Sequence, residues 1–387
     1  MNFKAYKYNF DRSIEDKIEE NKEKYRNADY LWTDFNFLRG EAHRAKGIAK
    51  EIERAGKTLV VAGIGGSFLG AEAAISALNP QKNKIHFIGN SLSTRAALKK
   101  LSDLDEDFAL LVISKSGNTL ETIIAYTYMR EFMKNKFSDY NKRIFIMSQS
   151  LDSKLGRACQ KNGHNFIEIS SEVGGRYSVL TCVGLVPMAF AGIDVDKVID
   201  GALSVNVDHA ISYATYRNKF YEKDLFVEIF TVYEPDLEYL LKWILQLFAE
   251  SEGKEGKGIL PTYVINSRDL HSLGQYIQSG RQMFFETTIS PLNSNSNLEV
   301  SLEDYGLNLN MTLNELNDLT RKSVMKSHSS NQLLLEIEKI DEFNLGCIFY
   351  FFEYACQVSA KILGVDPFNQ PGVEEYKAIL RKKLYEK

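Results

Sequence analysis

Residues 57–78 read Lys-Thr-Leu-Val-Val-Ala-Gly-Ile-Gly-Gly-Ser-Phe-Leu-Gly-Ala-Glu-Ala-Ala-Ile-Ser-Ala-Leu. The apolar run at 58–62, the glycines after it and the helical composition from Phe68 onward predict one strand–loop–helix unit. The same pattern recurs at 108–113 followed by 119–133 and at 143–147 followed by 153–161, and a further strand is predicted at 84–88. Continuous apolar strands that alternate with helices indicate a parallel sheet covered by helices on both faces.

A second α/β region is predicted from about residue 225 onward. Residues 226–233 have the pattern of a strand, and Pro235 introduces a helix that runs to about Glu250. Further strands are expected at 262–265, 283–289 and 298–302, a buried helix at 345–363 and a last helix at 373–384, whereas 290–297 has the composition of a loop. The fold class is therefore α/β, with two doubly wound domains and helical arms. We place a helical arm at 1–56, the first domain at 57–205, the second at 206–365, and a C-terminal loop and helix at 366–387.

The composition disfavours several classes of protein. The 387 residues carry 47 basic and 51 acidic side chains, a net charge of −4, so nothing overall favours nucleic acid or an anionic membrane as a partner. The most apolar stretch, 179–191, is broken by Thr181, Gly184 and Pro187 and is shorter than the roughly 20 residues that span a bilayer. The N-terminus lacks the apolar segment of a secretory signal, so we expect a cytoplasmic protein.

Cysteine and histidine are too sparse to predict a disulfide framework or a metal site. The four cysteines are scattered and include no Cys-x-x-Cys pair, so we expect them to be reduced and mostly buried. The six histidines show no ligand-like spacing. We therefore expect no metal.

Two loops have the composition of a phosphate site. Gly63-Ile-Gly-Gly-Ser67 lies between a strand and a helix, where glycines let backbone N–H groups approach an anion and the Ser67 hydroxyl adds a donor. Ser114-Lys-Ser-Gly-Asn-Thr119 occupies the equivalent place in another unit, with three hydroxyls and one ammonium. The alternative is that both are ordinary turns whose Ser and Thr cap helices. That alternative is weaker for the second loop, because a lysine has no capping role there.

Neither loop fits a nucleotide-binding motif. A dinucleotide site would show Gly-x-Gly-x-x-Gly, but position 68 is Phe, and the next strand ends in Asn90 where a ribose-binding carboxylate would be expected. The sequence also contains no Gly-x-x-x-x-Gly-Lys-Ser/Thr loop. We therefore reject NAD as a cofactor.

Candidates for proton transfer lie in the second region. Gln246 and Glu250 are four residues apart and so share a helix face, and Glu250 leads into a polar segment, 251–258, that we expect to be flexible. A carboxylate at the edge of such a loop suits a general base, and the alternative is a solvated helix end. His271 is a lone candidate, and a single histidine is more often structural.

Two further cations could bind an anion. Arg176, in Gly174-Gly-Arg-Tyr-Ser178, follows a predicted strand and opens an apolar helix, where it could bind an anion or pair with a carboxylate. Lys377 lies near the start of the last helix, where the macrodipole disfavours a cation. A bound anion would relieve this, and so would Glu374 or Glu375 beside it.

Taken together, these segments resemble the glucose-6-phosphate isomerase (phosphoglucose isomerase) family of the bacterial type. Six motifs in the order of that family carry the resemblance, and they cover most of the chain from about residue 57. They are Gly63-Ile-Gly-Gly-Ser67, Ile113-Ser-Lys-Ser-Gly-Asn-Thr119, Val173-Gly-Gly-Arg-Tyr-Ser-Val-Leu-Thr181, Glu250-Ser-Glu-Gly-Lys254, Asp269-Leu-His-Ser-Leu-Gly-Gln-Tyr276 and Phe368-Asn-Gln-Pro-Gly-Val-Glu-Glu-Tyr-Lys377.

The resemblance implies two sugar-isomerase (SIS) domains and interconversion of glucose 6-phosphate with fructose 6-phosphate, a small-molecule substrate, without a cofactor. It implies that Glu250 moves a proton between C2 and C1 and that Arg176 stabilises the cis-enediolate. It further implies that His271 and Lys377 assist ring opening, with His271 donated across the interface of a homodimer. The residues that the resemblance assigns to substrate binding are Gly66, Ser67, Ser114, Lys115, Ser116, Thr119, Gln246 and Gln370.

Some features depart from the family. The segment before Lys57 and the tail after Lys377 are shorter than usual, and residues 326–332 replace a glycine-rich stretch. These departures bear on the dimer contact, because terminal arms wrap the partner in this family. Two alternatives stay open: a dual isomerase that also accepts mannose 6-phosphate, and a non-catalytic sugar-phosphate sensor built from the same domains.

Overall fold

The computed structural model describes residues 1–6, 13–80, 82, 84–104, 107–294, 296–306 and 310–386. The chain forms two compact units, each discontinuous in sequence. The first unit comprises Ala28–Ser204 and Asp341–Tyr350, and the second comprises Met1–Asn27, Val205–Ile340 and Phe351–Lys387. The first 56 residues are thus divided between the two units.

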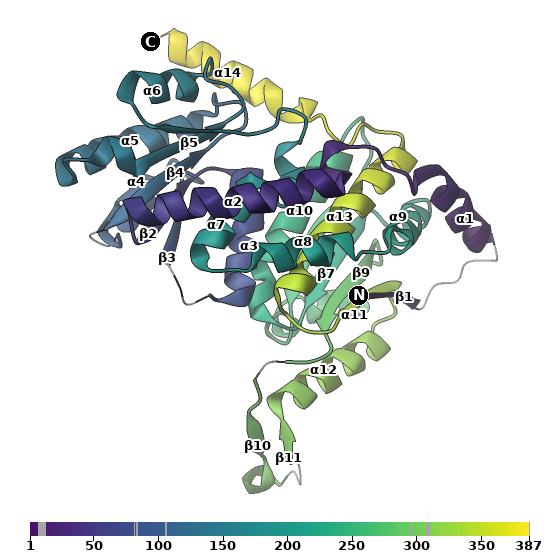
Figure 1. Cartoon of the computed structure of the whole chain (residues 1–387). Coiled ribbons are helices and arrows are strands. Elements are labelled where there is room, and N and C mark those ends of the chain that lie inside the picture. Colours follow the sequence, from purple (N-terminus) through teal and green to yellow (C-terminus); the bar gives the residue numbers. More distant parts are fainter. Residues whose placement is uncertain are drawn as a thin grey trace. The chain divides into compact units, whose positions relative to one another are not determined.

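The first unit is built on a parallel sheet of five strands in the order β3-β2-β4-β5-β6 (Figure 1). The strands are β2 (Thr58–Ala62), β3 (Lys84–Ile88), β4 (Phe108–Ile113), β5 (Ile144–Ser148) and β6 (Asn165–Glu168). The helices are α2 (Phe35–Ala55), α3 (Leu69–Leu78), α4 (Thr94–Ser102), α5 (Leu120–Lys136), α6 (Lys154–Asn162), α7 (Cys182–Ala191) and α8 (Val195–Leu203). All residues of β2, β4 and β5 are buried, as expected for central strands covered on both faces.

The second unit contains a five-stranded sheet in the order β1-β12-β9-β7-β8, in which only the edge strand β1 is antiparallel. The strands are β1 (Asn2–Tyr6), β7 (Val227–Val232), β8 (Leu260–Ile265), β9 (Phe284–Pro291) and β12 (Gln332–Ile337). The helices are α1 (Ser13–Tyr25), α9 (Val207–Tyr221), α10 (Glu238–Glu252), α11 (Gly274–Ser279), α12 (Leu313–Ser327) and α14 (Glu374–Tyr385). Helix α13 (Glu342–Leu363) gives its first residues to the first unit and the rest to the second.

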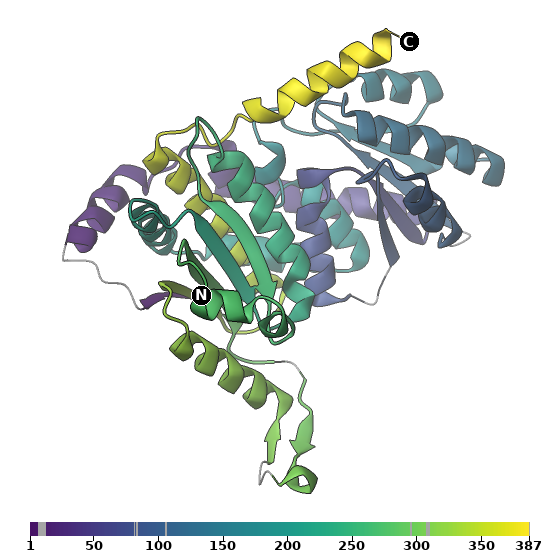
Figure 2. The same cartoon turned by 180° about the vertical axis from the view of Figure 1, so that it is seen from behind.

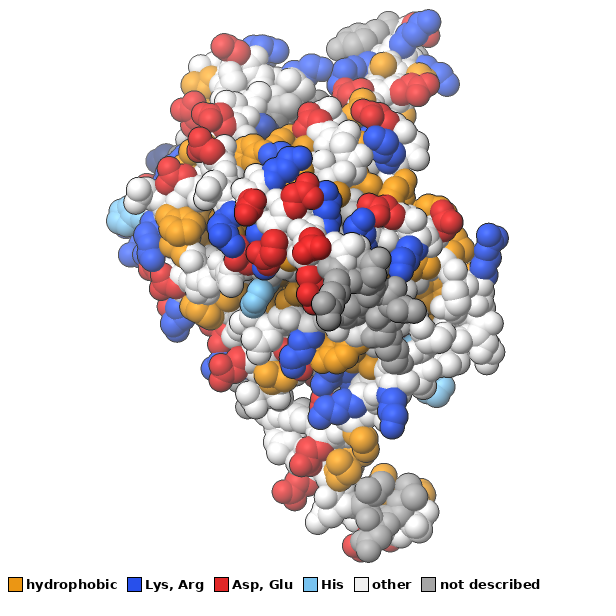
Figure 3. Space-filling view, turned by 90° about the vertical axis from the view of Figure 1, so that its right-hand side faces the viewer, with side chains coloured by type: hydrophobic (Ala, Val, Ile, Leu, Met, Phe, Trp, Pro, Cys, Tyr) orange, Lys and Arg blue, Asp and Glu red, His pale blue; other side chains and the backbone are white. Residues whose placement is uncertain are grey.

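An antiparallel hairpin of β10 (Glu299–Ser301) and β11 (Asn310–Thr312) precedes α12 and projects away from the main sheet of the second unit (Figure 2). The strand predicted at 298–302 therefore exists, but it pairs only within this hairpin. On the face drawn in Figure 3, basic and acidic side chains lie interspersed, in line with the near balance of charge in the sequence.

The predicted α/β class and the main strands are confirmed, whereas four strands were not predicted. Strand β6, at a sheet edge, has only two apolar residues, which lie between the exposed Asn165 and Glu168, so it lacks a long apolar run. Strand β12 follows a polar loop, and β1 and β11 are short edge or hairpin strands. All four cysteines are buried thiols, as expected. Among the described helices, none combines the length and the hydropathy needed to cross a bilayer.

Candidate active site

The first unit places both candidate phosphate loops at one edge of its sheet. Strands β2 and β4 are parallel neighbours, with Ala62 opposite Val112, although β3 comes between them in sequence and lies on the other side of β2. The chain therefore reverses its direction of winding between β2 and β4. In open α/β sheets, ligands bind at such a switch point, outside the carboxyl ends of the strands. The loops 63–67 and 114–119 leave the sheet there.

The first loop forms a single 3-10 turn, Gly65–Ser67, before α3 begins at Leu69. No side chain caps α3, so Ser67 does not serve as the helix cap that the structural alternative required. A Cβ atom on Gly66 would lie 2.2 Å from the carbonyl oxygen of Gly175. Glycine at 66 thus allows the turn that carries Arg176 to pack directly against this loop.

The second loop holds its hydroxyls without using them as helix caps. Thr119 is the N-cap residue of α5, but its side chain makes no capping bond. Instead the buried Ser114 hydroxyl donates to Thr119 Oγ1 over 3.0 Å, and Ser116 Oγ accepts from the backbone N of Asn118 over 3.2 Å. Gly117 has φ +60°, and a Cβ there would lie 2.1 Å from Ser153 Oγ. This geometry argues against the capping alternative for the second loop as well.

Lys115 supplies the positive charge of this loop. Its side chain is partly buried, and burial lowers the pKa of its ammonium. Within the part of the chain that the structure describes, no carboxylate forms an ion pair with Lys115. Its backbone carbonyl is fixed by bonds from Gln149 N, at 3.1 Å, and Ser148 Oγ, at 3.2 Å. A partly desolvated ammonium of this kind gains from a bound anion.

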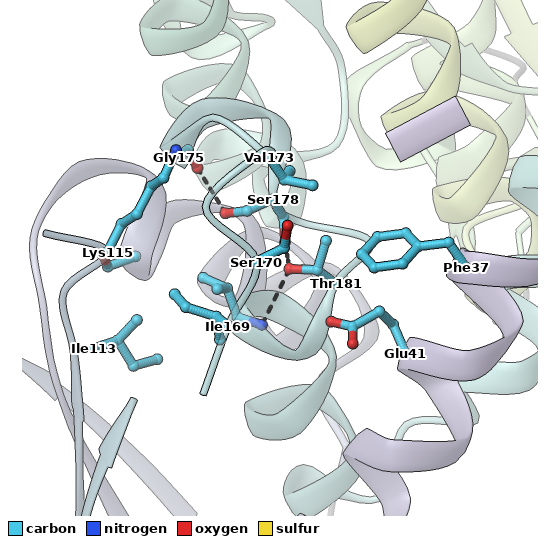
Figure 4. Close-up of a pocket in the computed structure, with 12 residues that line it drawn as sticks. Phe37, Glu41, Ile113, Lys115, Ile169, Ser170, Val173, Gly175, Ser178 and Thr181 are labelled. Atoms are coloured by element: carbon cyan, nitrogen blue, oxygen red, sulfur yellow. Dashed lines mark hydrogen bonds between the residues drawn. The ribbon is translucent and has the colours of Figure 1, made fainter. Parts of the chain in front are cut away.

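A small pocket lies beside the two loops in the first unit (Figure 4). Its polar lining consists of Glu41, Ser67, Lys115, Ser170, Ser178 and Thr181, and its apolar lining of Phe37, Ile113, Ile169, Val173 and Val183. Figure 4 shows the Glu41 carboxylate directed from α2 toward Thr181. Hydroxyls, one ammonium and one carboxylate therefore line a pocket beside the two loops.

Arg176 belongs to a 3-10 turn, Gly175–Tyr177, beside this pocket. The residue is only 4% exposed, and its guanidinium carbon lies 5.8 Å from the centre of the Tyr177 ring. The apolar helix expected to open at this position begins later, at Cys182, because Ser178 to Thr181 form a further turn. Arg176 thus lies on the connection between β6 and α7.

The second unit holds Glu250 near the end of α10. Gln246 Nε2 donates to Glu250 Oε1 over 3.1 Å, so the two side chains share a face, as predicted. Two residues later, Glu252 is fully buried and pairs with Arg217, at 2.5 Å. Arg217 also binds Glu228 of β7 at 2.7 Å. The last turn of α10 is therefore fixed by buried ion pairs.

The expectation that 251–258 is a flexible polar segment is wrong. Ser251 and Glu252 are fully buried and continue α10, and Lys254 is 8% exposed. The Lys254 ammonium donates to the backbone carbonyl of Asp366, and Lys257 Nζ donates to that of Leu363 over 3.2 Å. The polar side chains anchor this turn to the end of α13, which composition alone could not show.

The remaining candidates of the second unit lie on turns and at a helix start. His271 is exposed at the end of the 3-10 turn Arg268–His271, which follows β8. Gln370 is exposed and precedes the turn Pro371–Val373. Lys377 lies in the first turn of α14, where its Nζ pairs with Glu374 Oε1 at 2.9 Å. Of the two explanations considered for Lys377, the neighbouring carboxylate is the one observed.

The structure thus sorts the predicted residues into two groups. The first unit holds Gly66, Ser67, Ser114, Lys115, Ser116, Thr119 and Arg176, and the second holds Gln246, Glu250, His271, Gln370 and Lys377. Glu41, which lines the pocket, was not predicted from the sequence. Its signal was available, because Glu41 lies on the buried stripe of α2 between Leu38 and Ala45, where an apolar residue is the norm. In the described segments, no group of three or more His, Cys, Asp or Glu side chains could hold a metal ion.

Two doubly wound α/β units, one with a glycine-rich loop and a hydroxyl-rich loop at its switch point, define a protein of the SIS fold. The sequence profile of the family described as Phosphoglucose isomerase matches residues 44–257. The chain belongs to this family. A glucose-6-phosphate isomerase of Fusobacterium nucleatum is 38% identical over 92% of this chain and 87% of its own length. One of Acetivibrio thermocellus is 37% identical over 99% of this chain and 93% of its own.

Solved structures show the same fold. A hypothetical protein of Thermus thermophilus aligns with a TM-score of 0.86 at 23% identity, over 96% of this chain and 95% of that one. A glucose-6-phosphate isomerase of Chlamydia trachomatis aligns with a TM-score of 0.82 at 17% identity, over 99% of this chain and 88% of that one. At these identities the alignments support the fold, and the family rests on the sequence relatives.

Proposed function

We propose that this protein interconverts glucose 6-phosphate and fructose 6-phosphate. The observation that carries the proposal is the first-unit switch point, where hydroxyls and the Lys115 ammonium gather against the turn of Arg176. Family membership supports a phosphosugar as the anion that binds at this site, since the relatives described above bear the name glucose-6-phosphate isomerase. A dianionic sugar phosphate crosses membranes poorly, so we expect the activity in the cytoplasm.

The phosphate group is bound by the two loops of the first unit. Lys115 provides the charge, and the backbone near Gly66 and the hydroxyls of the loops provide hydrogen bonds. These contacts lie away from the reacting carbons, so their binding energy serves to orient C1 and C2. The residues to which we assign this role are Gly66, Ser67, Ser114, Lys115, Ser116 and Thr119.

Glu250 acts as the base. Its carboxylate takes the proton from C2 of the open-chain aldose while the electron pair of the C2–H bond forms the C1–C2 double bond and the C1 carbonyl becomes an enediolate oxygen. Arg176 stabilises the developing negative charge on the cis-enediolate. Return of the proton from Glu250 to C1, with transfer of the hydroxyl proton from O2 to O1, gives the ketose. No electrons leave the substrate, and Gln246 and Gln370 line the site.

Ring opening precedes this step, because the cyclic sugar has no free carbonyl. We assign it to His271 and Lys377, which can move a proton between the ring oxygen and the anomeric hydroxyl. In this proposal the Lys377 ammonium exchanges Glu374 for a substrate oxygen. The exposed position of His271 suits its donation to the site of a second copy in a homodimer.

The proposal is tested by a coupled assay of the purified protein on fructose 6-phosphate and, in parallel, on mannose 6-phosphate. We expect turnover of fructose 6-phosphate to glucose 6-phosphate without added cofactor. Absence of turnover would overturn the proposal. Comparable turnover of mannose 6-phosphate would identify a dual isomerase.

The shared site is tested by mixing two inactive variants, Glu250→Gln and His271→Ala. In a hybrid dimer with exchanged histidines, one of the two sites receives an intact Glu250 and an intact His271. Activity should therefore recover on mixing, in proportion to the hybrid fraction measured by native mass spectrometry. Hybrids that form without any recovery would show that His271 serves its own subunit.

A further inference from the structure

The connection between β6 and α7, which carries Arg176, is tied to helix α2 at both ends. At its far end, the backbone N of Cys182 donates to Glu41 Oε2 over 2.7 Å. At its near end, Arg44 Nη2 donates to the backbone carbonyl of Glu168. The two ties are joined, because Arg44 Nη1 donates to Glu41 Oε1 over 3.0 Å. One acid–base pair on α2 therefore closes the loop that holds Arg176.

Hydrogen bonds inside the connection extend the tie from α7 to the arginine turn. Thr181 Oγ1 donates to the carbonyl of Ser178 over 2.8 Å, and Ser178 Oγ donates to the carbonyl of Gly175 over 2.7 Å. Gly175 is the residue whose carbonyl packs against Gly66 in the first phosphate loop. A displacement at the start of α7 would thus reach the turn that carries Arg176.

Packing alone does not require a carboxylate at position 41. Glu41 is 7% exposed and shares its face of α2 with Leu38, Ala42 and Ala45. Burying a charge is unfavourable unless it is paired and hydrogen-bonded. Here the charge receives one bond from Arg44 and one from the N–H of Cys182, a donor that the first turn of a helix cannot use internally. The carboxylate therefore acts on the end of α7.

We propose that Glu41, held by Arg44, is a positioning residue that fixes Arg176 for stabilisation of the enediolate. The proposal rests on the function assigned above, because it gives Arg176 a role in the reaction. Charge stabilisation depends on preorganised geometry, and a misplacement of about 1 Å can reduce the rate by about 100-fold. Glu41 itself contacts no reacting atom in this account.

The first experiment compares Glu41→Ala and Glu41→Gln with Glu51→Gln, which changes an exposed carboxylate on the same helix. We expect kcat to fall about 10- to 100-fold in E41A. A smaller fall is expected in E41Q, because an amide oxygen can still accept from Cys182. Inhibition by inorganic phosphate should stay within about twofold in all three variants, because Lys115 and the loop hydroxyls are unchanged. If E41A does not fold, E41Q and Arg44→Gln test the proposal in its place. A kcat within about twofold of wild type in both variants would overturn the proposal.

The second experiment asks whether Glu41 acts through Arg176. We expect Arg176→Lys and the double variant E41A/R176K to have nearly equal kcat. If Glu41 acts only by positioning the Arg176 guanidinium, its removal has no further effect once that guanidinium has been replaced. If the double variant instead lost kcat by the product of the two single-variant losses, the proposal would be overturned. The rate of amide hydrogen exchange in residues 169–181 should rise in E41A and stay unchanged in Glu51→Gln. Unchanged exchange in E41A would refute the positioning role of Glu41, whether or not the chain is an isomerase. An inactive wild type with raised exchange in E41A would instead refute only the proposed function.

Discussion

The two units share a winding pattern, yet the loops after their first strands at the switch point differ in composition. In the second unit the chain also reverses its winding, between β7 and β9, with β8 on the other side of β7. The loop after β7 reads Tyr233-Glu234-Pro235 where the first unit has glycines and Ser67. Glu234 carries negative charge, and Pro235 has no N–H to offer an anion. The fold places loops at the carboxyl edge of each sheet, and the residues of those loops determine which ligands can bind there.

The units also differ in how their candidate groups are held. The first unit uses backbone contacts, hydroxyls and a lysine whose pKa is lowered by burial. The second surrounds the end of α10 with fully buried ions, in which Arg217 binds Glu228 and Glu252 and lies 3.9 Å from the centre of the Phe248 ring. The residues that we assign to binding and those that we assign to proton transfer are therefore held by different kinds of interaction, and single substitutions should separate the two proposed roles.

The largest expected effect is on turnover, from Glu250→Gln in the second unit. We expect kcat to fall about 10²- to 10⁴-fold, the usual contribution of a general base, while the KM for fructose 6-phosphate changes little. Steady-state kinetics test this against Glu255→Gln, a nearby exposed carboxylate. Undiminished kcat would place the base elsewhere.

The next effect concerns stability, from Arg217→Met in the same unit. Removal of the guanidinium leaves Glu228 and Glu252 buried without their cation, which we expect to cost about 3–5 kcal/mol of unfolding free energy. The control is Arg26→Met, which breaks an exposed pair with Asp208 and should cost about 0–1 kcal/mol. Denaturant unfolding measures both. Equal losses would show that the buried cluster is no more important than a surface pair.

A smaller effect, on binding, is expected from Lys115→Met in the first unit. Loss of a charge-assisted contact to phosphate should cost about 1.5–3 kcal/mol, which raises KM and the inhibition constant of phosphate roughly 10- to 150-fold. Stability should not fall, because the ammonium is partly desolvated and pairs with no described carboxylate. Lys99→Met, on exposed α4 of the same unit, is the control. Unchanged phosphate inhibition would remove Lys115 from the site.

The sequence predicted the central strands and both loops because each leaves a local signal. Apolar runs mark strands buried on both faces, and a lysine among hydroxyls at a helix start has no packing role. The sequence marks Glu41 as a charged residue on an apolar helix face, but it does not show the partner of Glu41. Glu41 and Cys182 are far apart in sequence and meet only after α2 packs on α7. The anchoring of Lys254 was missed for the same reason, because its acceptor, the carbonyl of Asp366, lies on the segment after α13.

The smallest expected effect concerns the loop after β7 at the switch point of the second unit, through Glu234→Gln. Burial raises the pKa of Glu234 above its usual value, and Asn317 Nδ2 donates to its Oε1 over 3.1 Å. Because the folded-state pKa is raised, ionisation favours the unfolded chain, so the penalty is absent below the unfolded pKa of about 4.3 and grows as pH rises through it. Glutamine keeps the acceptor for Asn317 and lacks the charge. We therefore expect Glu234→Gln to stabilise the protein by about 0.5 kcal/mol at pH 7 and by nothing at pH 4. The control is Glu255→Gln, which changes an exposed carboxylate of the same unit. Destabilisation of Glu234→Gln at pH 7 would mean that the second unit relies on the Glu234 charge.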